Sequence, residues 1–367
     1  MNYRSFISPE TQFYHLSEPF QLESGATLTG VRVAYRTWGK LDPDGKNVVL
    51  VCHALTGSAD VDVWWQPLLG VGRSLDPEHD FIVCSNILGS CYGTTGPTDL
   101  NPATGNAYGV AFPAITIRDM VRLQARLVAM LGIRSLRLVI GGSLGGMQVL
   151  EWAVLYPEMV QAIAVIAAPG RHSAWCIGWN EAQRQAIYAD PNWQQGNYTD
   201  DRRPDQGLAI ARMIAMSTYR SWANFSTRFG RHIGQTDAFA IAEYLQYQGR
   251  KLVERFDANT YLTLSHALDQ HDVSRPNRTY EEVLQSIDQP TLIVSIRSDI
   301  LYPPTEQEEL AFWISNAQLK NLESPCGHDA FLIDMKQLND LVFDFRTQSK
   351  PSVKKPRIMI PECSQSS

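Results

Sequence analysis

A glycine-rich turn around Ser143 constrains this chain more than any other feature of its sequence. Residues 136–140 form a mostly apolar run that predicts a strand, and residues 147–156 have the pattern of a helix. The six residues between these two segments are Gly-Gly-Ser-Leu-Gly-Gly. Glycines have no Cβ, so they let a strand and a helix approach closely, and a serine on so sharp a turn needs strained backbone angles. We therefore expect the Ser143 hydroxyl to point out of a sheet, close to the N-terminus of the following helix.

This strand, turn and helix match the nucleophile elbow of α/β-hydrolases, whose serine attacks an acyl group. The alternative is a turn with an incidental serine, because Gly-x-Ser-x-Gly alone is a common pattern. The flanking strand and helix favour the nucleophile. The oxyanion formed in acyl transfer needs backbone N–H donors, which we expect from Leu144 and from Leu55, in the loop at residues 53–57. His53 precedes the elbow in the chain, so we expect it to orient this loop rather than to take part in catalysis.

The remaining pattern predicts an α/β fold, with a mostly parallel sheet and helices on both of its faces. Strands with continuous apolar character alternate with helices, which is typical of a sheet that is buried on both sides. Residues before about position 29 are expected to be irregular. The predicted strands cover residues 31–38, 47–52, 81–85, 136–140, 160–166, 291–296 and 317–322, and the predicted helices of this core cover residues 117–131, 147–156, 305–314 and 329–345.

A helical lid is expected to interrupt the sheet. Residues 173–285 contain no convincing buried strand but show helical spacing at residues 180–188, 207–217, 238–256 and 259–268. We therefore expect a core of residues 1–172 and 286–367, with residues 173–285 inserted above the carboxyl ends of the strands, where open α/β sheets place their sites. The tail from residue 349 is polar and contains prolines, so we expect it to be loosely held.

The composition excludes several classes of function. The net charge is −6 and the basic residues are scattered, which argues against binding to nucleic acid or to an anionic membrane surface. No segment has the length and apolarity of a signal peptide or a membrane span, so we expect a cytoplasmic protein. The six cysteines form no CxxC pair, which favours buried free thiols in a reducing compartment, and no metal site is predicted.

A serine nucleophile needs a base and an acid, and in this fold class they follow in the order serine, acid, histidine. His328 fits the base, because it lies between the last predicted strand and the last helix, whereas the other late histidines fall in the lid. Asp299 follows the strand at residues 291–296 and could accept the imidazole N–H. The alternatives are that Asp299 serves only its turn, or that Asp329 or Asp334 is the acid.

Taken together, the motifs along the chain resemble those of the homoserine O-acetyltransferase family of α/β-hydrolase-fold acyltransferases. Leu144 stands where that family often has methionine, a mild change at a position used through its backbone. The matching segments are His-Ala-Leu-Thr-Gly-Ser at residues 53–58, Gly-Thr-Thr-Gly-Pro at 93–97, the elbow at 141–148, Thr-Tyr-Arg-Ser at 218–221, Ser298-Asp299 with Pro303-Pro304, and Gly-His-Asp-Ala-Phe-Leu at 327–332.

The resemblance implies a site and a reaction. It implies Ser143, Asp299 and His328 as a catalytic triad, and Arg212 and Asp329 as the residues that hold L-homoserine. It also implies acetyl-CoA or succinyl-CoA as co-substrate with no bound cofactor, a role in methionine biosynthesis, and cytoplasmic homodimers that pair through the lid. Without the resemblance, Arg212 would be interpreted as a solvated charge on a helix.

The residues alone leave four alternatives to acetyl transfer open. The donor could be succinyl-CoA, the acceptor could be serine, or the lid could admit water and make the protein a plain esterase. A non-catalytic binding protein is the fourth, although such a protein has no need of a complete serine, aspartate and histidine set.

Overall fold

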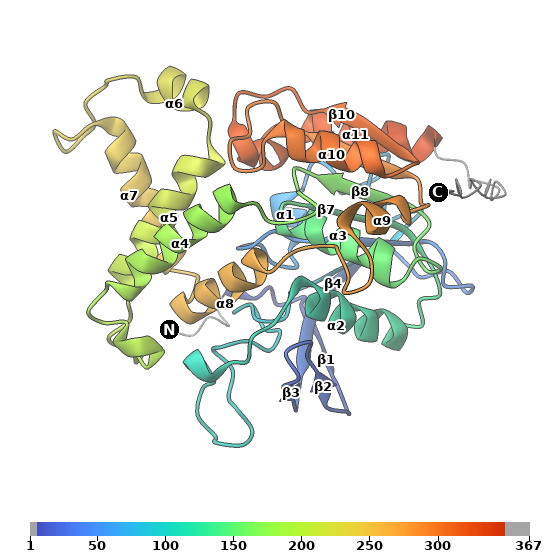
Figure 1. The fold of residues 1–367 in the computed structure, drawn as a ribbon, viewed down its shortest axis with the longest axis horizontal. Coiled ribbons are helices and arrows are strands. Elements are labelled where there is room, and N and C mark those ends of the chain that lie inside the picture. The colour runs from blue at the N-terminus through green and yellow to red at the C-terminus, as the bar shows by residue number, and fades with distance from the viewer. Residues whose placement is uncertain (1–5, 349–367) are drawn as a thin grey trace, which may run out of the picture.

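An eight-stranded sheet forms the centre of the molecule, in a computed structural model that describes residues 6–348 (Figure 1). The two pairs at one edge are antiparallel, and every other neighbouring pair is parallel. A separate two-stranded hairpin is made by β2 (Phe20–Gln21) and β3 (Thr27–Leu28). In spatial order, the strands of the main sheet are β1 (Gln12–His15), β4 (Arg32–Trp38), β6 (Phe81–Ser85), β5 (Val48–Cys52), β7 (Leu136–Gly142), β8 (Ile163–Ile166), β9 (Thr291–Ser295) and β10 (Ala317–Asn321).

Alternate residues of the central strands enter two separate hydrophobic cores, one on each face of the sheet. In β5, Val48 and Leu50 face one core, and Val49 and Val51 face the other. The helices on the first face are α2 (Ile117–Met130), α3 (Leu144–Leu155), α9 (Tyr280–Gln285) and α10 (Pro304–Trp313), and those on the second face are α1 (Val61–Trp64) and α11 (Met335–Gln348). The predicted α/β arrangement with a mostly parallel sheet is therefore confirmed.

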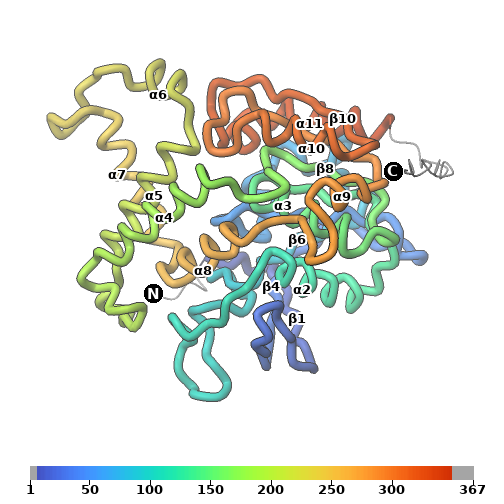
Figure 2. Tube along the Cα trace, in the orientation of Figure 1, coloured from blue at the N-terminus to red at the C-terminus, as the bar shows by residue number. Residues whose placement is uncertain are grey.

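Helices also fill the chain between β8 and β9. They are α4 (Ala174–Tyr188), α5 (Asp205–Tyr219), α6 (Trp222–Phe229), α7 (Ala240–Val253), α8 (Ala258–Asp269) and α9. In Figures 1 and 2, α4, α5, α6 and α7 project to the left of the sheet, whereas α9 lies against the core. The hydroxyl of Tyr280 in α9 bonds with Glu309 of α10, 3.2 Å away, which fixes α9 on the core side.

The structure differs from the sequence prediction at several places, three of them in the core. The lead-in before residue 29 contains β1, β2 and β3; β1 is almost fully exposed, so no apolar alternation marked it. The strand predicted from residue 160 begins at Ile163. The helix predicted at residues 329–345 is divided, because a 3₁₀ helix, η4 (Gly327–Leu332), ends at the non-helical Ile333 and α11 begins at Met335.

Candidate active site

The backbone of Ser143 is strained, as the elbow prediction requires. Its φ is 58° and its ψ is −126°, a conformation that glycine adopts readily and that costs other residues about 1–3 kcal/mol. The neighbouring glycines are needed for space: a Cβ on Gly145 would lie 2.1 Å from the carbonyl oxygen of Cys52, and one on Gly142 would lie 2.7 Å from the ring of Phe331. The elbow is therefore packed directly against β5 and η4.

The two expected oxyanion donors are available. Leu144 is the first residue of α3, so its N–H has no acceptor within the helix. Within residues 6–348, neither this N–H nor that of Leu55 donates a hydrogen bond to the protein. The side chains of Leu55 and Leu144 are both buried, so their packing holds the two backbone N–H groups in place.

His328 and Asp299 form a buried pair. The Nδ1 of His328 lies 2.6 Å from Oδ2 of Asp299, and both residues are 3% exposed. The Nε2 of His328 is buried and has no hydrogen-bond partner among the residues that the structure describes. The hydroxyl of the attacking serine would provide the missing hydrogen bond. We therefore expect the imidazole to exchange a proton with that hydroxyl through Nε2.

Backbone and side-chain bonds hold this pair in place. The other carboxylate oxygen of Asp299 accepts the N–H groups of Leu301, at 2.8 Å, and Tyr302, at 3.0 Å. The hydroxyl of Ser298 donates to the carbonyl of Ser324, at 2.6 Å, and accepts the N–H of Gly327, at 2.9 Å. The loop after β9 is thereby tied to the loop that carries His328.

The two rival acids have other partners. Oδ2 of Asp329 is 3.2 Å from Nε of Arg220, an ion pair that is poorly aligned for a hydrogen bond. Asp334 accepts the hydroxyl of Ser324. Neither aspartate bonds to the imidazole of His328, so the geometry favours Asp299 as its acid.

Electrostatics raise the pKa of His328 above the ordinary value of 6.5. Burial by itself would lower that pKa, but the negative charge and hydrogen bond of Asp299 outweigh it, and Asp329 adds to them. Burial also raises the pKa of Asp329, against the nearby charges of Arg220, Arg212 and His328. The site therefore holds its charges in a poorly solvated environment, where each ion pair counts more than on the surface.

The lid contributes side chains to the surroundings of His328. The ring of Tyr219, at the end of α5, lies 5.8 Å from the imidazole, and the guanidinium of Arg212 lies 5.2 Å from the ring of Tyr219. Arg212 is half-buried rather than fully solvated. The structure thus brings Arg212 and Asp329 to the same region as the His328 imidazole.

Several residues near the site were not predicted individually. Arg255, after α7, donates to the carbonyl of Thr56, at 2.8 Å, and to the hydroxyl of Tyr92. The ring of Tyr302 packs 5.1 Å from that of His328, and its hydroxyl lies 3.1 Å from Nε2 of His172. Arg220 belongs to the Thr-Tyr-Arg-Ser segment, for which the family resemblance was the only signal. Its ion pair with Asp329 joins residues about a hundred positions apart, so no local pattern predicts it.

The five cysteines among residues 6–348 are all free thiols, and Cys326, two residues before His328, is only half-buried. Cys52, Cys84, Cys91 and Cys176 are buried free thiols, as predicted, and burial raises the pKa of each, for Cys176 to about 12. Cys363 and the tail predicted to be loosely held lie outside the described residues. Residues 6–348 contain no group of three or more His, Cys, Asp or Glu side chains placed to hold a metal ion. No helix in this range is long and apolar enough to cross a membrane.

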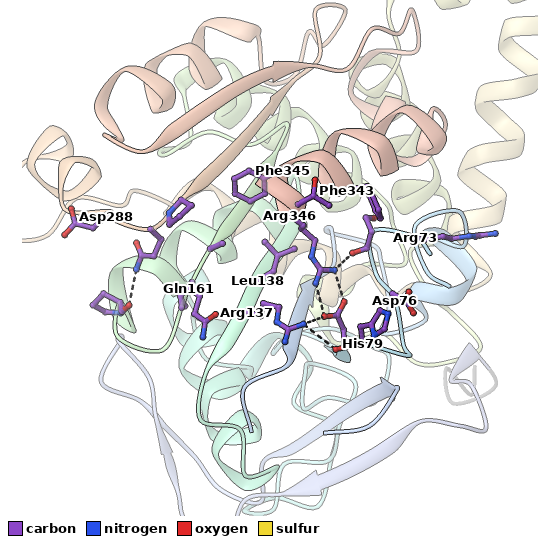
Figure 3. A pocket seen from close by; sticks show the side chains of 18 of the residues that line it. Arg73, Asp76, His79, Arg137, Leu138, Gln161, Asp288, Phe343, Phe345 and Arg346 are labelled. Atoms are coloured by element: carbon purple, nitrogen blue, oxygen red, sulfur yellow. Dashed lines mark hydrogen bonds and ion pairs between the residues drawn. The ribbon is translucent and has the colours of Figure 1, made fainter. Parts of the chain in front are cut away.

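A cavity of about 820 Å³ lies at the opposite end of the sheet (Figure 3). Its lining residues include Asp80, Arg137 and Gln289, which come just before β6, just inside β7 and just before β9. These are the amino ends of parallel strands, whereas Ser143 and Asp299 follow the carboxyl ends of β7 and β9. Asp80 is paired with Arg137 and Arg346, so these three charges in the lining of the cavity already have partners.

A strained serine after a central parallel strand and a buried aspartate–histidine pair at the same end of the sheet define the chain as an α/β-hydrolase-fold protein. A family model described as "alpha/beta hydrolase fold" matches residues 47–334. The chain is 68% identical to a homoserine O-acetyltransferase from Trichormus variabilis over 94% of its length and 96% of that protein. It therefore belongs to the homoserine O-acetyltransferase family.

Solved structures show the same fold. A homoserine O-acetyltransferase from Bacillus anthracis superposes with a TM-score of 0.86 at 25% identity, covering 93% of this chain and 98% of that one. An esterase, E22, superposes with a TM-score of 0.85 at 26% identity, covering 92% and 99%. The backbone is therefore shared by proteins named as transferases and as esterases, and function has to be argued from the site.

Proposed function

We propose that Ser143, Asp299 and His328 carry out the homoserine O-acetyltransferase reaction of this chain, passing an acetyl group from acetyl-CoA to the hydroxyl of L-homoserine. The observation that supports this assignment most strongly is the buried His328–Asp299 pair, which lies at the same end of the sheet as the strained Ser143 and whose Nε2 has no hydrogen-bond partner among residues 6–348. The curated relatives at 51–68% identity are named homoserine O-acetyltransferases, which favours acetyl over succinyl transfer.

The first half-reaction acylates the enzyme. The Oγ of Ser143 attacks the thioester carbonyl carbon while Nε2 of His328 takes the hydroxyl proton. The N–H groups of Leu55 and Leu144 stabilise the oxyanion of the tetrahedral intermediate. When the intermediate collapses, the carbon–sulfur bond breaks, His328 returns the proton to the departing sulfur, and free CoA leaves an acetyl-serine.

The second half-reaction uses the same groups in the reverse order. The hydroxyl oxygen of homoserine attacks the acetyl-serine carbonyl, and Nε2 of His328 takes the hydroxyl proton. Collapse of this intermediate breaks the bond to Oγ of Ser143, which regains the proton from His328. The products are O-acetyl-homoserine and free enzyme, so the kinetics are ping-pong.

Arg212 and Asp329 suit the two charges of the acceptor. A zwitterion in a dehydrated pocket needs a cation for its carboxylate and an anion for its ammonium, or its desolvation cost is not recovered. Arg212 offers a planar two-point grip on a carboxylate. Burial raises the pKa of Asp329, so its ionised form needs a cation close by. The ammonium of homoserine would bind there beside Arg220 or in its place.

We also propose that the helical insertion, predicted at residues 173–285, is the lid of this site, except for α9, which lies against the core. Two contacts support this proposal: the ring of Tyr219 lies 5.8 Å from that of His328, and Arg255 donates to the carbonyl of Thr56, next to Leu55. Such cover would keep water from the acetyl-serine, which separates a transferase from an esterase of the same fold.

The test measures the two half-reactions separately. Incubation with acetyl-CoA alone should add one acetyl group to the intact mass of the protein, and Ser143→Ala should take up none. Arg212→Ala should acylate at nearly the wild-type rate but transfer slowly to homoserine, so that hydrolysis becomes a larger share of turnover. Arg212→Lys should recover only part of the transfer, because lysine lacks the two-point grip.

Two results would contradict the assignment. Full activity in Ser143→Ala would remove the serine from the mechanism. Failure of Arg212→Ala to acylate, with homoserine binding unchanged, would place Arg212 on the CoA side of the site instead. Succinyl-CoA and serine, supplied in the same assays, test the alternative donor and acceptor.

A further inference from the structure

We propose that Gln148 and His53 are positioning residues that align the two backbone donors of the oxyanion hole. The inference rests on the proposed function, because it concerns the intermediate formed at Ser143. Leu55 and Leu144 lie on different segments, one in the loop after β5 and the other at the start of α3. Something must fix the distance between these segments, because both N–H groups have to reach one oxygen atom.

Gln148 connects the two segments. Its side chain is fully buried, and its Nε2 lies 3.2 Å from the carbonyl oxygen of His53 and 3.3 Å from that of Leu144. An amide nitrogen has two N–H groups, so one is available for each carbonyl. One side chain thus bonds to the donor residue Leu144 itself and to the backbone two residues before Leu55.

Gln148 is itself held by a buried chain of hydrogen bonds. Its Oε1 accepts from Nε2 of Gln124, at 2.8 Å, and Oε1 of Gln124 accepts from Nε1 of Trp152, also at 2.8 Å. The indole nitrogen can only donate, so it fixes the orientation of the Gln124 amide, and Gln124 in turn fixes that of Gln148. The nitrogen of Gln148 must therefore face the two carbonyls.

His53 fixes the other side of the loop. Its Nδ1 lies 2.8 Å from the carbonyl oxygen of Ala54, and its Nε2 lies 3.2 Å from the backbone nitrogen of Ile87. Burial lowers the pKa of this imidazole to about 4, so it is neutral, with one donor and one acceptor. Nδ1–H donates and Nε2 accepts, which holds the peptide directly before Leu55 against the end of β6. The ring is part of the loop's structure and takes no proton from the substrate.

The decisive variant is Gln148→Met, which keeps the volume and removes both N–H groups. We expect the rate of acylation by acetyl-CoA to fall about 10- to 100-fold, somewhat less than for loss of an oxyanion donor itself, while KM for acetyl-CoA changes by less than about threefold. A trifluoromethyl ketone, whose adduct with Ser143 carries an oxyanion, should lose affinity by the same factor. Gln148→Glu keeps the shape without N–H groups and should not rescue.

The chain offers a matched control in Gln289. This buried glutamine also donates to two backbone carbonyls, those of Ala153 and Pro157, but at the amino end of the sheet. Gln289→Met should lower the melting temperature comparably to Gln148→Met and leave acylation within about twofold of wild type. For His53, asparagine can supply an N–H near the place of Nδ1–H, so His53→Asn should retain more acylation than His53→Phe.

The outcomes separate this inference from the proposed function. A folded Gln148→Met that acylates and binds the ketone as wild type does overturns the positioning role, and so does a Gln289→Met that is equally slow. Wild-type protein that takes up no acetyl group contradicts the proposed function, and the positioning role fails with it. Slow acylation with weak ketone binding in Gln148→Met alone supports the proposal.

Discussion

At the scale of single residues, the charge of Asp299 sets the pH dependence of the base. Because the pKa of His328 is raised, the imidazole becomes neutral, and able to take a proton, only with a midpoint above pH 6.5. The kcat/KM for acylation should therefore fall on the acid side with a midpoint above 6.5. In Asp299→Asn, the carboxylate that raises the pKa of His328 is gone and burial still lowers that pKa. The midpoint should therefore move to lower pH.

The rate in Asp299→Asn should also fall on the plateau, by about 10³- to 10⁴-fold, because the asparagine no longer fixes the imidazole tautomer. The measurement is the pH profile of single-turnover acylation. Asp334→Asn, which removes a carboxylate that bonds only to Ser324, is the control and should keep the wild-type midpoint. If Asp329→Asn shifts the profile and Asp299→Asn does not, the acid has been assigned to the wrong residue.

The residues of the proposed triad could be chosen from the sequence because chain order and strand position limit the candidates. Ser143 lies between a recognisable strand and helix, and Asp299 and His328 each follow a strand. The pairing of Arg220 with Asp329, and of Tyr302 with His172, could not be predicted, because each joins residues far apart in the sequence that only tertiary packing brings together. Long-range polar partners depend on tertiary geometry rather than on local pattern.

At the scale of elements, helix α3 is pressed against strand β5 at one residue. A Cβ at Gly145 would lie 2.1 Å from the carbonyl oxygen of Cys52 and 3.3 Å from that of His53, and backbone atoms cannot move aside as a flexible side chain can. We predict that Gly145→Ala lowers the free energy of unfolding by about 1–3 kcal/mol, the usual cost of overpacking. It should also slow acylation, because the displaced carbonyls precede Leu55.

Gly178, in the lid helix α4, is the matched control for this substitution. It is exposed, and a Cβ there would have no atom within 4 Å. Gly178→Ala should raise the free energy of unfolding by about 0.5–1 kcal/mol, because alanine favours the helical conformation more than glycine does. Chemical denaturation of both variants checks the pair. If Gly145→Ala and the wild type have equal free energies of unfolding, α3 can move away from β5 without loss of stability.

Helices and strands could be predicted from the sequence where apolar residues recur at the regular spacing of a buried face. The buried strands and α2 were predicted close to their observed bounds, whereas β1, an almost fully exposed edge strand, and the short α6 were not. The division of the last helix into η4 and α11 was not predicted either, because composition does not reveal the break at Ile333 and Asp334. This division matters, since η4 holds His328 on a short, tightly packed turn.

At the scale of the whole molecule, the two ends of the sheet differ in what covers them. The carboxyl ends carry the candidate site and the side chains of the lid, and the amino ends carry the open cavity of Figure 3. The helical insertion carries several exposed apolar side chains: Trp222 of α6 is 82% exposed, and Ile233, Phe239 and Tyr247 lie on or beside α7 and are also exposed. Exposed apolar groups of this kind are typical of association surfaces where they form a patch.

We therefore expect the protein to form homodimers through α6 and α7, which lie at the upper left of Figure 1. Light scattering at micromolar concentration should give twice the chain mass of 41.2 kDa. Trp222→Glu should shift the equilibrium towards monomer, because it places a charge at the centre of a contact that needs to be desolvated. Phe312→Glu is the control: Phe312 is 76% exposed, but it lies on α10 of the core, so its substitution should leave the mass unchanged. A wild-type mass of one chain at every concentration would refute the dimer, and dissociation by Phe312→Glu alone would move the interface from the lid to the core.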